Sequence, residues 1–342
     1  MSSTSGAHRS AVVLNVSTHT ADVYIGRGSP FGNPFVMRDR SDEERKRVIQ
    51  AFREWIKCQP ELLRLVRRSL HGKTLGCHCA PQECHGDVLA EIARGEWDDR
   101  IPLEPVMTFW SDLAGRHGRG AALFAKRNLG ADESVTRGPS GSSYAIPAKD
   151  DRLRPLPLEQ IHEEVQAFIR HARAHPEIPF QVARSGRGLM SYSDEQVAAL
   201  FAGAPMNVDL PGVWRRALAP ESTPIQVIIA GGRSFTDWTR LQSKLTHLLG
   251  NHPDATVVSG GARGADSLGE RFAVQHGLRL RRLPAEWDRF GKKAGPNRNH
   301  AMARLATHLV AFWDGHSRGT HHMIDTADRC GLEIRVVRID GG

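Results

Sequence analysis

The sequence predicts an α/β protein built from three modules, with a parallel sheet in the C-terminal third. Short continuous apolar runs at 227–230, 256–258 and 309–312 each lead into a glycine-bearing stretch. Apolar runs of this length without alternation suit the strands of a parallel sheet, which are buried on both faces. The chain of 342 residues is also longer than one ordinary domain.

Two segments rich in proline, charge and small residues, near 96–105 and 217–224, interrupt the periodic pattern. Hydrophobic residues make up 40% of the chain and charged residues 25%, which is an ordinary balance for globular domains. No apolar run approaches membrane-spanning length, so no membrane association is expected. The predicted modules are an N-terminal Cys/His domain, a middle α/β domain and the C-terminal sheet domain, at residues 11–97, 105–217 and 224–340.

The net charge of +8 favours anionic partners. The basic residues are spread along the chain and only 6% of residues are aromatic, so a small nucleotide-derived anion is favoured over nucleic acid. Of the five cysteines, three are clustered, which argues against a disulfide framework and for a reducing, cytoplasmic location. Self-association as a homo-oligomer is left open.

The N-terminal module begins with a predicted strand at 23–25 that enters a loop rich in glycine and proline. This loop, residues 26–35, carries Arg27 and Asn33 as candidate ligand-binding side chains. The next segment predicts an amphipathic helix with a cap at Ser41. Its apolar side chains recur at helical spacing and are expected in the core: Val48, Phe52, Trp55 and Ile56.

A cluster of three thiols and two imidazoles follows within nine positions: Cys77, His78, Cys79, Cys84 and His85. The three cysteines with one histidine would suit a tetrahedral zinc ion, although the first pair has a tighter spacing than a standard zinc knuckle. Two alternatives remain open. Cys84 lies at the predicted start of a helix, where the helix end lowers a thiol pKa and would activate a nucleophile. The cluster would otherwise be simply buried.

The loop at 26–35 and the Gly-Cys-His-Cys and Cys-His-Gly-Asp motifs at 76–79 and 84–87 resemble an uncharacterised domain common in phages and actinobacteria. The resemblance spans roughly residues 11–95. It implies that the loop and the cysteines face each other across one site.

The middle module contains a glycine-rich turn, with Gly118 and Gly120, that leads into an alanine-rich helix. Such a turn at a helix N-terminus can cradle a phosphate. His117 is a candidate general base beside it, and Asp150 follows a predicted strand at 143–149 as a candidate catalytic carboxylate.

The order of motifs in the middle module is similar to phage-associated domains related to macrodomains, which implies binding of ADP-ribose. Those relatives have a Gly-Ser-Asn-Leu-Ala-Gly loop, whereas this chain has Trp110 and Asp112 in the corresponding segment. The relatives also have an Ile-Gly-Cys-Gly turn, where residues 185–188 read Ser-Gly-Arg-Gly. These departures predict an altered ligand preference or activity.

In the C-terminal module, the glycine-bearing stretches follow three predicted parallel strands. Because parallel strands present their carboxyl ends at one edge of the sheet, ligands bind there. Glycine lets backbone N–H groups approach a phosphate, and the following helix N-terminus adds partial positive charge. The candidate ligand-binding residues are Gly231, Gly232, Arg233, Gly260, Gly261, Arg263, Gly264, Ser317, Arg318, Gly319 and Thr320.

Five motifs in order across residues 224–340, including Gly-Gly-Arg-Ser-Phe-Thr-Asp at 231–237 and Gly-Gly-Ala-Arg-Gly-Ala-Asp at 260–266, resemble the YspA-type branch of the SLOG superfamily. The resemblance implies a Rossmann-like sheet and a nucleotide-like ligand. Phosphoribohydrolases of this superfamily use an Arg and a Glu beside a Pro-Gly-Gly-x-Gly-Thr loop. Here the loop is Asp-Gly-His-Ser-Arg-Gly-Thr, which keeps a basic side chain in Arg318. Arg298 could supply a bidentate clamp on phosphate.

Three hypotheses for function follow from these motifs. The first is an enzyme that cleaves or transfers at an N-glycosidic or phosphoribosyl bond, with Asp266, Asp314 and Asp150 as candidate acids or bases. The second is a sensor in which ligand binding switches another module. The third is an enzyme of modified-nucleobase or DNA metabolism that uses the Cys/His metal site.

Overall fold

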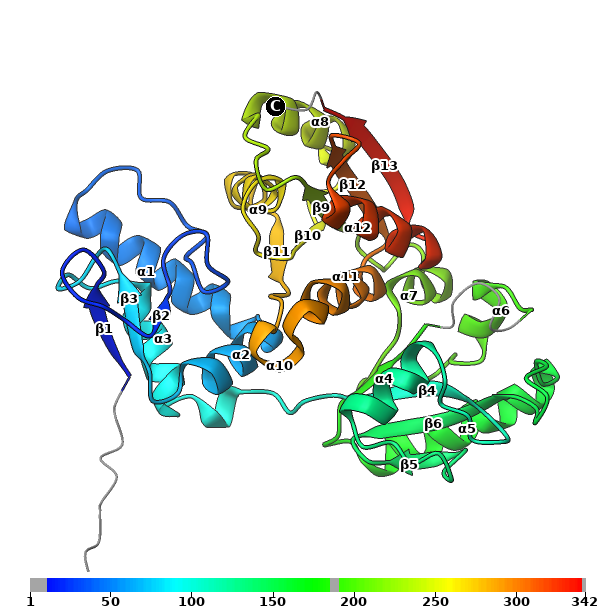
Figure 1. Cartoon of the computed structure of the whole chain (residues 1–342). Coiled ribbons are helices and arrows are strands. Elements are labelled where there is room, and N and C mark those ends of the chain that lie inside the picture. The colour runs from blue at the N-terminus through cyan, green and yellow to red at the C-terminus, as the bar shows by residue number, and fades with distance from the viewer. Residues whose placement is uncertain (1–10, 185–190, 340–342) are drawn as a thin grey trace, which may run out of the picture.

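The computed structural model describes residues 11–184 and 191–339 and shows three separate sheets along the chain (Figure 1). The predicted α/β fold class with a parallel C-terminal sheet is confirmed. The turn predicted at 185–188 lies outside the described residues. Among the described residues, none of the helices combines the length and apolar character needed to cross a bilayer.

The N-terminal domain is a small three-stranded parallel sheet with helices packed against it. Ser41 caps the first helix by accepting a hydrogen bond from the Glu44 amide at 3.2 Å. As predicted from spacing, this helix buries Val48, Phe52 and Ile56. The strands, in the order β1-β3-β2, and helices are β1 (Val12–Asn15), β2 (Val23–Tyr24), β3 (Thr74–Cys77), α1 (Asp42–Lys57), α2 (Pro60–Leu70), α3 (His85–Arg94) and η1 (Asp98–Arg100).

The middle domain has a five-stranded sheet in the order β5-β6-β4-β7-β8, parallel except for the β5–β6 pair. Trp214, Phe168 and Phe180 are fully buried in its core. Its elements are β4 (Val106–Asp112), β5 (Gly138–Ser140), β6 (Ser143–Lys149), β7 (Phe180–Val182), β8 (Val208–Asp209), α4 (Gly120–Asn128), α5 (Leu158–Ala174), α6 (Asp194–Ala199) and α7 (Gly212–Leu218).

The C-terminal domain is a fully parallel five-stranded sheet in the order β11-β10-β9-β12-β13, with a hydrophobic core on each face. After β9, the strands β10 and β11 are added on one side of it, and β12 and β13 are added on the other side. The order of the strands therefore reverses between β9 and β12, which is the topological switch point. Its elements are β9 (Gln226–Gly231), β10 (Thr256–Ser259), β11 (Arg279–Arg282), β12 (His308–Trp313), β13 (Glu333–Arg338), α8 (Trp238–Leu249), α9 (Ala265–Gln275), α10 (Trp287–Phe290), η2 (Gly291–Lys293), α11 (Ala294–Leu305) and α12 (Arg318–Arg329).

The N-terminal domain covers the edge strand β11 of the C-terminal sheet. The indole Nε1 of Trp55 and the amide Nε2 of Gln59 both donate to the carbonyl oxygen of Leu280, at 3.1 and 2.8 Å. Gln59 Oε1 in turn accepts from the backbone N–H of Arg282 at 2.9 Å. Polar groups of an otherwise open sheet edge are thereby satisfied, and the two domains are joined.

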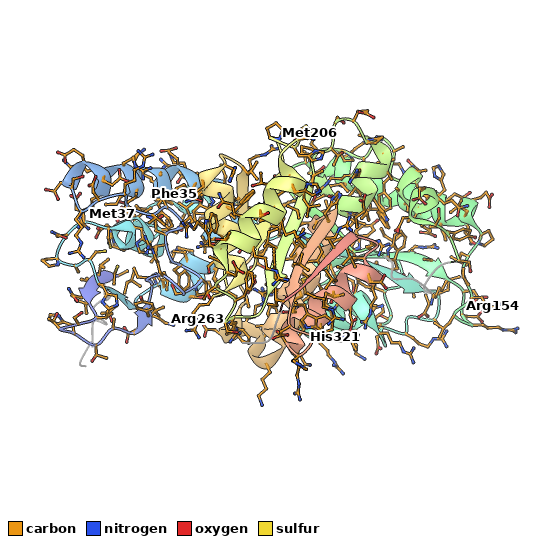
Figure 2. All side chains as sticks on the ribbon, turned by 90° about the horizontal axis from the view of Figure 1, so that it is seen from above. Phe35, Met37, Arg154, Met206, Arg263 and His321 are labelled. Carbon is orange, nitrogen blue, oxygen red and sulfur yellow. The ribbon has the colours of Figure 1, made fainter. Side chains whose placement is uncertain are left out.

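The middle domain packs against α11 on another side of the C-terminal domain. A Cβ at Gly212 would lie 2.2 Å from the carbonyl oxygen of Leu305, so only glycine permits this close approach. Arg304 of α11 pairs with Asp209 at 2.5 Å, and Arg215 pairs with the same carboxylate. The C-terminal domain therefore lies between the other two, as Figure 2 shows.

Candidate functional site

Three loops meet at the carboxyl edge of the C-terminal sheet. Gly231, the last residue of β9, lies close against β12 at the switch point, where a Cβ on it would be 2.6 Å from the carbonyl oxygen of Phe312. Gly264 has a φ of +81°, and a Cβ there would lie 2.1 Å from the carbonyl oxygen of Gly232. The loops after β9 and β10 thus touch, and their glycines are required by this approach.

Asp314 shapes the loop that enters α12. Its Oδ1 accepts the backbone N–H groups of His316 and Ser317 at 2.9 and 2.8 Å, and these bonds hold the pKa of the carboxyl below its ordinary value. Thr320 Oγ1 donates to Ser317 Oγ at 3.0 Å within the same turn. The second oxygen of Asp314 faces the β9 loop, 3.9 Å from the position of a Cβ on Gly232.

Asp266 is buried at the start of α9 and holds the loop after β10. It accepts the backbone N–H groups of Gly260 and Ala262, at 3.1 and 3.4 Å, and burial raises its pKa. Arg298 lies 3.9 Å from the carboxylate and donates to the carbonyl oxygen of Gly260 at 2.8 Å. The predicted phosphate clamp Arg298 is therefore bound to the loop itself, and it positions the glycine amides.

Cations and free amides remain available at this edge. Arg233, Arg263 and Arg318 are exposed, and within the described part of the chain none of them forms a hydrogen bond or ion pair. Helices α9 and α12 have no side-chain cap among the described residues, so no capping side chain occupies their first N–H groups. Gly319 has open space around its Cα, whereas the N–H of Gly261, whose φ is +68°, is bonded to Ser259 Oγ.

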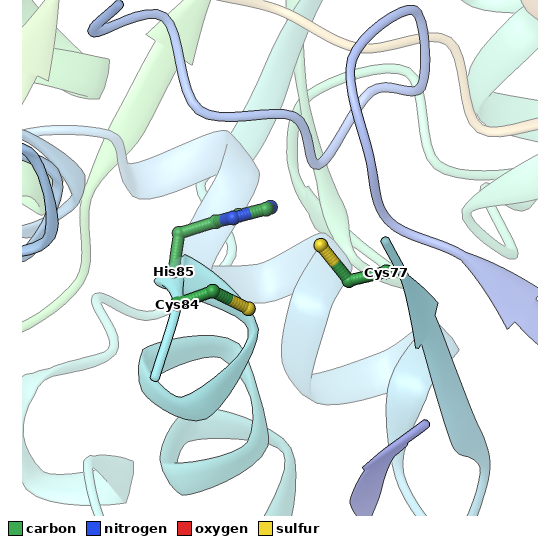
Figure 3. Close-up of side chains that lie close together, drawn as sticks. All are labelled: Cys77, Cys84 and His85. Carbon is green, nitrogen blue, oxygen red and sulfur yellow. The ribbon is translucent and has the colours of Figure 1, made fainter. Parts of the chain in front are cut away.

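The cysteine cluster lies between the end of β3 and the start of α3. Figure 3 shows Cys77, Cys84 and His85 directed into one space, and their ligand atoms lie within 4.8 Å of one another. The imidazole Nε2 of His85 is 2.9 Å from the carbonyl oxygen of Ile25. Because a carbonyl only accepts, this nitrogen carries the proton and Nδ1 keeps the lone pair, as in metal-binding histidines.

The other two members of the predicted cluster differ in position. The thiol of Cys79 hydrogen-bonds with the thiols of Cys77 and Cys84, which lower its pKa to about 2, while the same bonding raises the pKa of Cys84. His78 is exposed, with its ring against Tyr24, and is not in the group of close ligand atoms.

A pocket of about 260 Å³ opens beside these cysteines, and the glycine-rich loop forms part of its wall. The structure therefore brings the loop and the cysteines together, as the N-terminal resemblance implies. Arg27 lines the pocket and is exposed, whereas both ends of the Asn33 amide are engaged, with the Val48 carbonyl and the Phe35 amide. Asn33 therefore shapes the loop.

Arg282 connects the two sites, and sequence analysis missed it. Its Nη1 donates to the carbonyl oxygen of Gly32 at 2.7 Å, and its Nε donates to Glu270 at 2.8 Å in a buried ion pair. Glu270 accepts from the hydroxyl of Ser259 at 2.7 Å, and this hydroxyl accepts the Gly261 N–H at 3.0 Å. The N-terminal loop and the C-terminal glycine loop are thus held by one bonded chain.

The same two loops also touch near solvent. A Cβ on Gly28, whose φ is +85°, would lie 3.6 Å from the side chain of Arg263. Figure 2 places Arg263 where the N-terminal and C-terminal domains meet. Strand β11 reads Arg-Leu-Arg-Arg, so the sequence pattern does not distinguish Arg282 from the other arginines of the strand.

The candidate residues of the middle domain do not join the C-terminal edge. His117 is 1% exposed, its ring packs edge-on against Phe109, and neither ring nitrogen has a partner in the described structure. Burial lowers its pKa. Asp150 accepts from the backbone and side chain of Arg154, which Figure 2 shows at the far end of the molecule from Arg263.

The glycine turn of the middle domain is open, in contrast to its histidine. A Cβ at Gly118 or Gly120 would meet no atom within 4 Å. Helix α4, which starts at Gly120, has no side-chain cap hydrogen bond. The backbone of this turn is accessible, and Gly120 lines a pocket together with Arg289 and Lys293 of the C-terminal domain.

Comparison with protein-family models finds two matches. Residues 13–95 match a domain of unknown function, DUF4326, and residues 225–290 match the YspA, cpYpsA-related SLOG family. Among solved structures, the DNA processing protein A (DprA) of Streptococcus pneumoniae is similar at 18% identity with a TM-score of 0.29, covering 34% of this chain and 51% of DprA. The chain thus spans about half the length of that protein.

Two phage proteins are similar over almost their whole length. The gene 61 protein of Mycobacterium phage D29 is 37% identical over 118 residues, which are 32% of this chain and 93% of the phage protein. An uncharacterized 12.4 kDa protein in the nrdA-td intergenic region of Enterobacteria phage T4 is 32% identical over 107 residues, 30% of this chain and 96% of that protein. The chain therefore belongs to the family of these phage proteins, with an N-terminal DUF4326 domain and a C-terminal domain of the YspA, cpYpsA-related SLOG family.

Proposed function

We propose that the C-terminal domain binds a small phosphorylated ligand derived from a nucleotide, such as ADP-ribose, an NAD product or a nucleoside phosphate. The observation that carries the proposal is the combination at one sheet edge of glycine loops, two uncapped helix N-termini and three unpaired arginines. Helix N-termini, glycine-rich loops and arginine side chains are groups that commonly bind phosphate in proteins. The match to the SLOG family supports a nucleotide-related ligand.

Replacing Arg263 or Arg318 by alanine is expected to weaken ligand binding by about tenfold or more, because each charge-assisted contact contributes about 1.5–3 kcal/mol. Calorimetric titration with ADP-ribose and AMP measures the change. Arg335→Ala is the matched control, since Arg335 is an exposed arginine within β13, away from the loops. Wild-type affinity for both nucleotides in both site variants, with an unchanged melting temperature, would reject the assigned role.

Cleavage of an N-glycosidic bond is the finer form of this proposal. Burial raises the pKa of Asp266, which favours a protonated acid, and hydrogen bonds lower the pKa of Asp314, which favours a carboxylate. Two carboxyls with divergent pKa values at one edge suit an acid and a base. Free base released from AMP or ADP-ribose by the wild-type protein is the readout. A wild-type protein that binds these compounds without release supports a sensor.

We also propose that Cys77, Cys84 and His85 bind a zinc ion, since thiolate with imidazole is a donor set that suits zinc. The hydrogen bond from His85 Nε2 to Ile25 supports the proposal because it orients Nδ1 as a ligand. The likeness of the middle domain to macrodomains, with ADP-ribose as its ligand, remains a prediction. The open backbone at Gly118 and Gly120 is the feature that supports it.

A further inference from the structure

The pocket of the N-terminal domain has metal-type ligands in one wall and arginines in another. We propose that it is a binding site for a small oxyanion, a phosphate or carboxylate group, which completes the coordination of a metal held by Cys77, Cys84 and His85. This inference rests on the proposed metal site. It goes beyond that proposal because it makes the metal part of a ligand site, separate from the C-terminal sheet edge.

The number of ligand atoms points to an open metal position. Structural zinc sites are closed by four protein ligands, whereas sites that bind substrate or water have three. Three ligand atoms lie within 4.8 Å of one another here. The thiol of Cys79 hydrogen-bonds with Cys77 and Cys84 but is not in this group, which also contains His85. All four residues line the pocket, so the remaining position faces space that a small molecule can enter.

The arginines of the pocket supply the reason for an oxyanion. Arg27 is exposed and has no hydrogen bond or ion pair within the described part of the chain. Arg45 is fixed by bonds from its Nη atoms to the Gln82 side chain and the Glu83 carbonyl, at 2.7 and 3.4 Å. Its Nε, however, is buried and has no partner. Buried N–H groups are nearly always paired, so an acceptor from a ligand would complete this one.

The size and the remaining lining of the pocket limit the ligand. A volume of about 260 Å³ is near the lower end for small-molecule pockets, which suits one phosphorylated or carboxylated metabolite. Tyr24 and Phe35 offer aromatic surface, and Glu83 is the acidic side chain in the lining. The anion would therefore lie toward Arg27 and Arg45, with an apolar or ring portion beside the aromatic groups.

Cobalt substitution of the full chain tests the inference. Co²⁺ is bound in place of the native metal, free cobalt is removed, and the visible absorption bands are followed as inorganic phosphate is added. The bands are expected to shift at saturation, because the anion enters the coordination sphere. Arg27→Gln and Arg45→Gln are each expected to raise the phosphate concentration that gives half of the band shift by about tenfold. Arg40→Gln, an exposed arginine outside the pocket, is the control and should titrate as wild type.

Each contrary result has a distinct meaning. A protein that binds no stoichiometric cobalt contradicts the metal proposal itself. Bound cobalt whose bands ignore phosphate, and whose sulfur-to-cobalt absorption falls in Cys79→Ser, shows a closed site with Cys79 as fourth ligand and overturns the inference. The inference is also overturned if Arg27→Gln and Arg45→Gln bind cobalt and melt as the wild type does, and their bands shift at the same phosphate concentration.

Discussion

Replacing Arg282 by methionine is expected to lower the free energy of unfolding by about 3–5 kcal/mol, because it leaves the buried carboxylate of Glu270 without its partner. The same change removes the bonds from Arg282 to the carbonyl oxygens of Gly32 and Pro30. The N-terminal loop should then lose its hold on the C-terminal domain. Denaturant unfolding measures the loss of free energy. The N-terminal and C-terminal domains of the variant should also melt in two separate transitions.

Arg281→Met is the matched control, since this neighbouring strand residue pairs with Glu61 in a more exposed ion pair. Because this pair is partly open to solvent, Arg281→Met should lower the free energy of unfolding by clearly less than Arg282→Met does. The double variant Arg282→Met with Glu270→Leu should recover much of the loss, because no buried charge remains. Equal small effects of the two arginine changes would contradict the role assigned to Arg282.

Removal of the metal is expected to destabilise the N-terminal domain by about 4 kcal/mol at metal concentrations a thousandfold above the dissociation constant. The proposed ligands come from two separate elements, the end of β3 and the start of α3, so metal binding and folding are coupled. Elemental analysis of protein purified without a metal-affinity tag should give about one equivalent of zinc. Cys77→Ser and Cys84→Ser should each lose the metal and melt earlier.

Cys58→Ser is the control for these variants, because Cys58 is an exposed thiol outside the cluster. It should retain metal and melting temperature. Less than a tenth of an equivalent of any transition metal, with all thiols of the folded protein freely titratable, would reject the metal. Cys79, whose pKa the neighbouring thiols lower, would then be the preferred reactive thiol in place of the predicted Cys84, whose pKa is raised.

Local patterns were enough to predict the loops of the C-terminal sheet. Continuous apolar runs indicated parallel strands, and the glycines after them are required by contacts such as that between Gly264 and the Gly232 carbonyl. The cap at Ser41 and the buried positions of α1 follow equally from spacing within one helix. In each of these cases the interacting residues are close in sequence or are brought together by the parallel topology, so the sequence pattern is enough to predict the contact.

Features that depend on distant partners could not be predicted. The position of His85 beside Cys77 and Cys84 depends on a contact between its Nε2 and the carbonyl of Ile25, sixty residues away, which no local pattern contains. Arg298 has the character of a phosphate clamp, yet it binds the Gly260 carbonyl after the helix α11 docks on the sheet. Arg282 acquires its role only when a second domain covers β11.

Mass spectrometry of small molecules retained by the purified full-length protein tests the central claim most directly. A phosphorylated, nucleotide-derived compound is expected with the wild-type protein and with Arg335→Ala. The variant with both Arg263→Ala and Arg318→Ala, folded to the same melting temperature, should retain far less of it. Retention of the same compound in equal amount by the double variant, or binding of neither ADP-ribose nor AMP when they are added to wild type, would contradict a nucleotide site at the carboxyl edge of β9, β10 and β12.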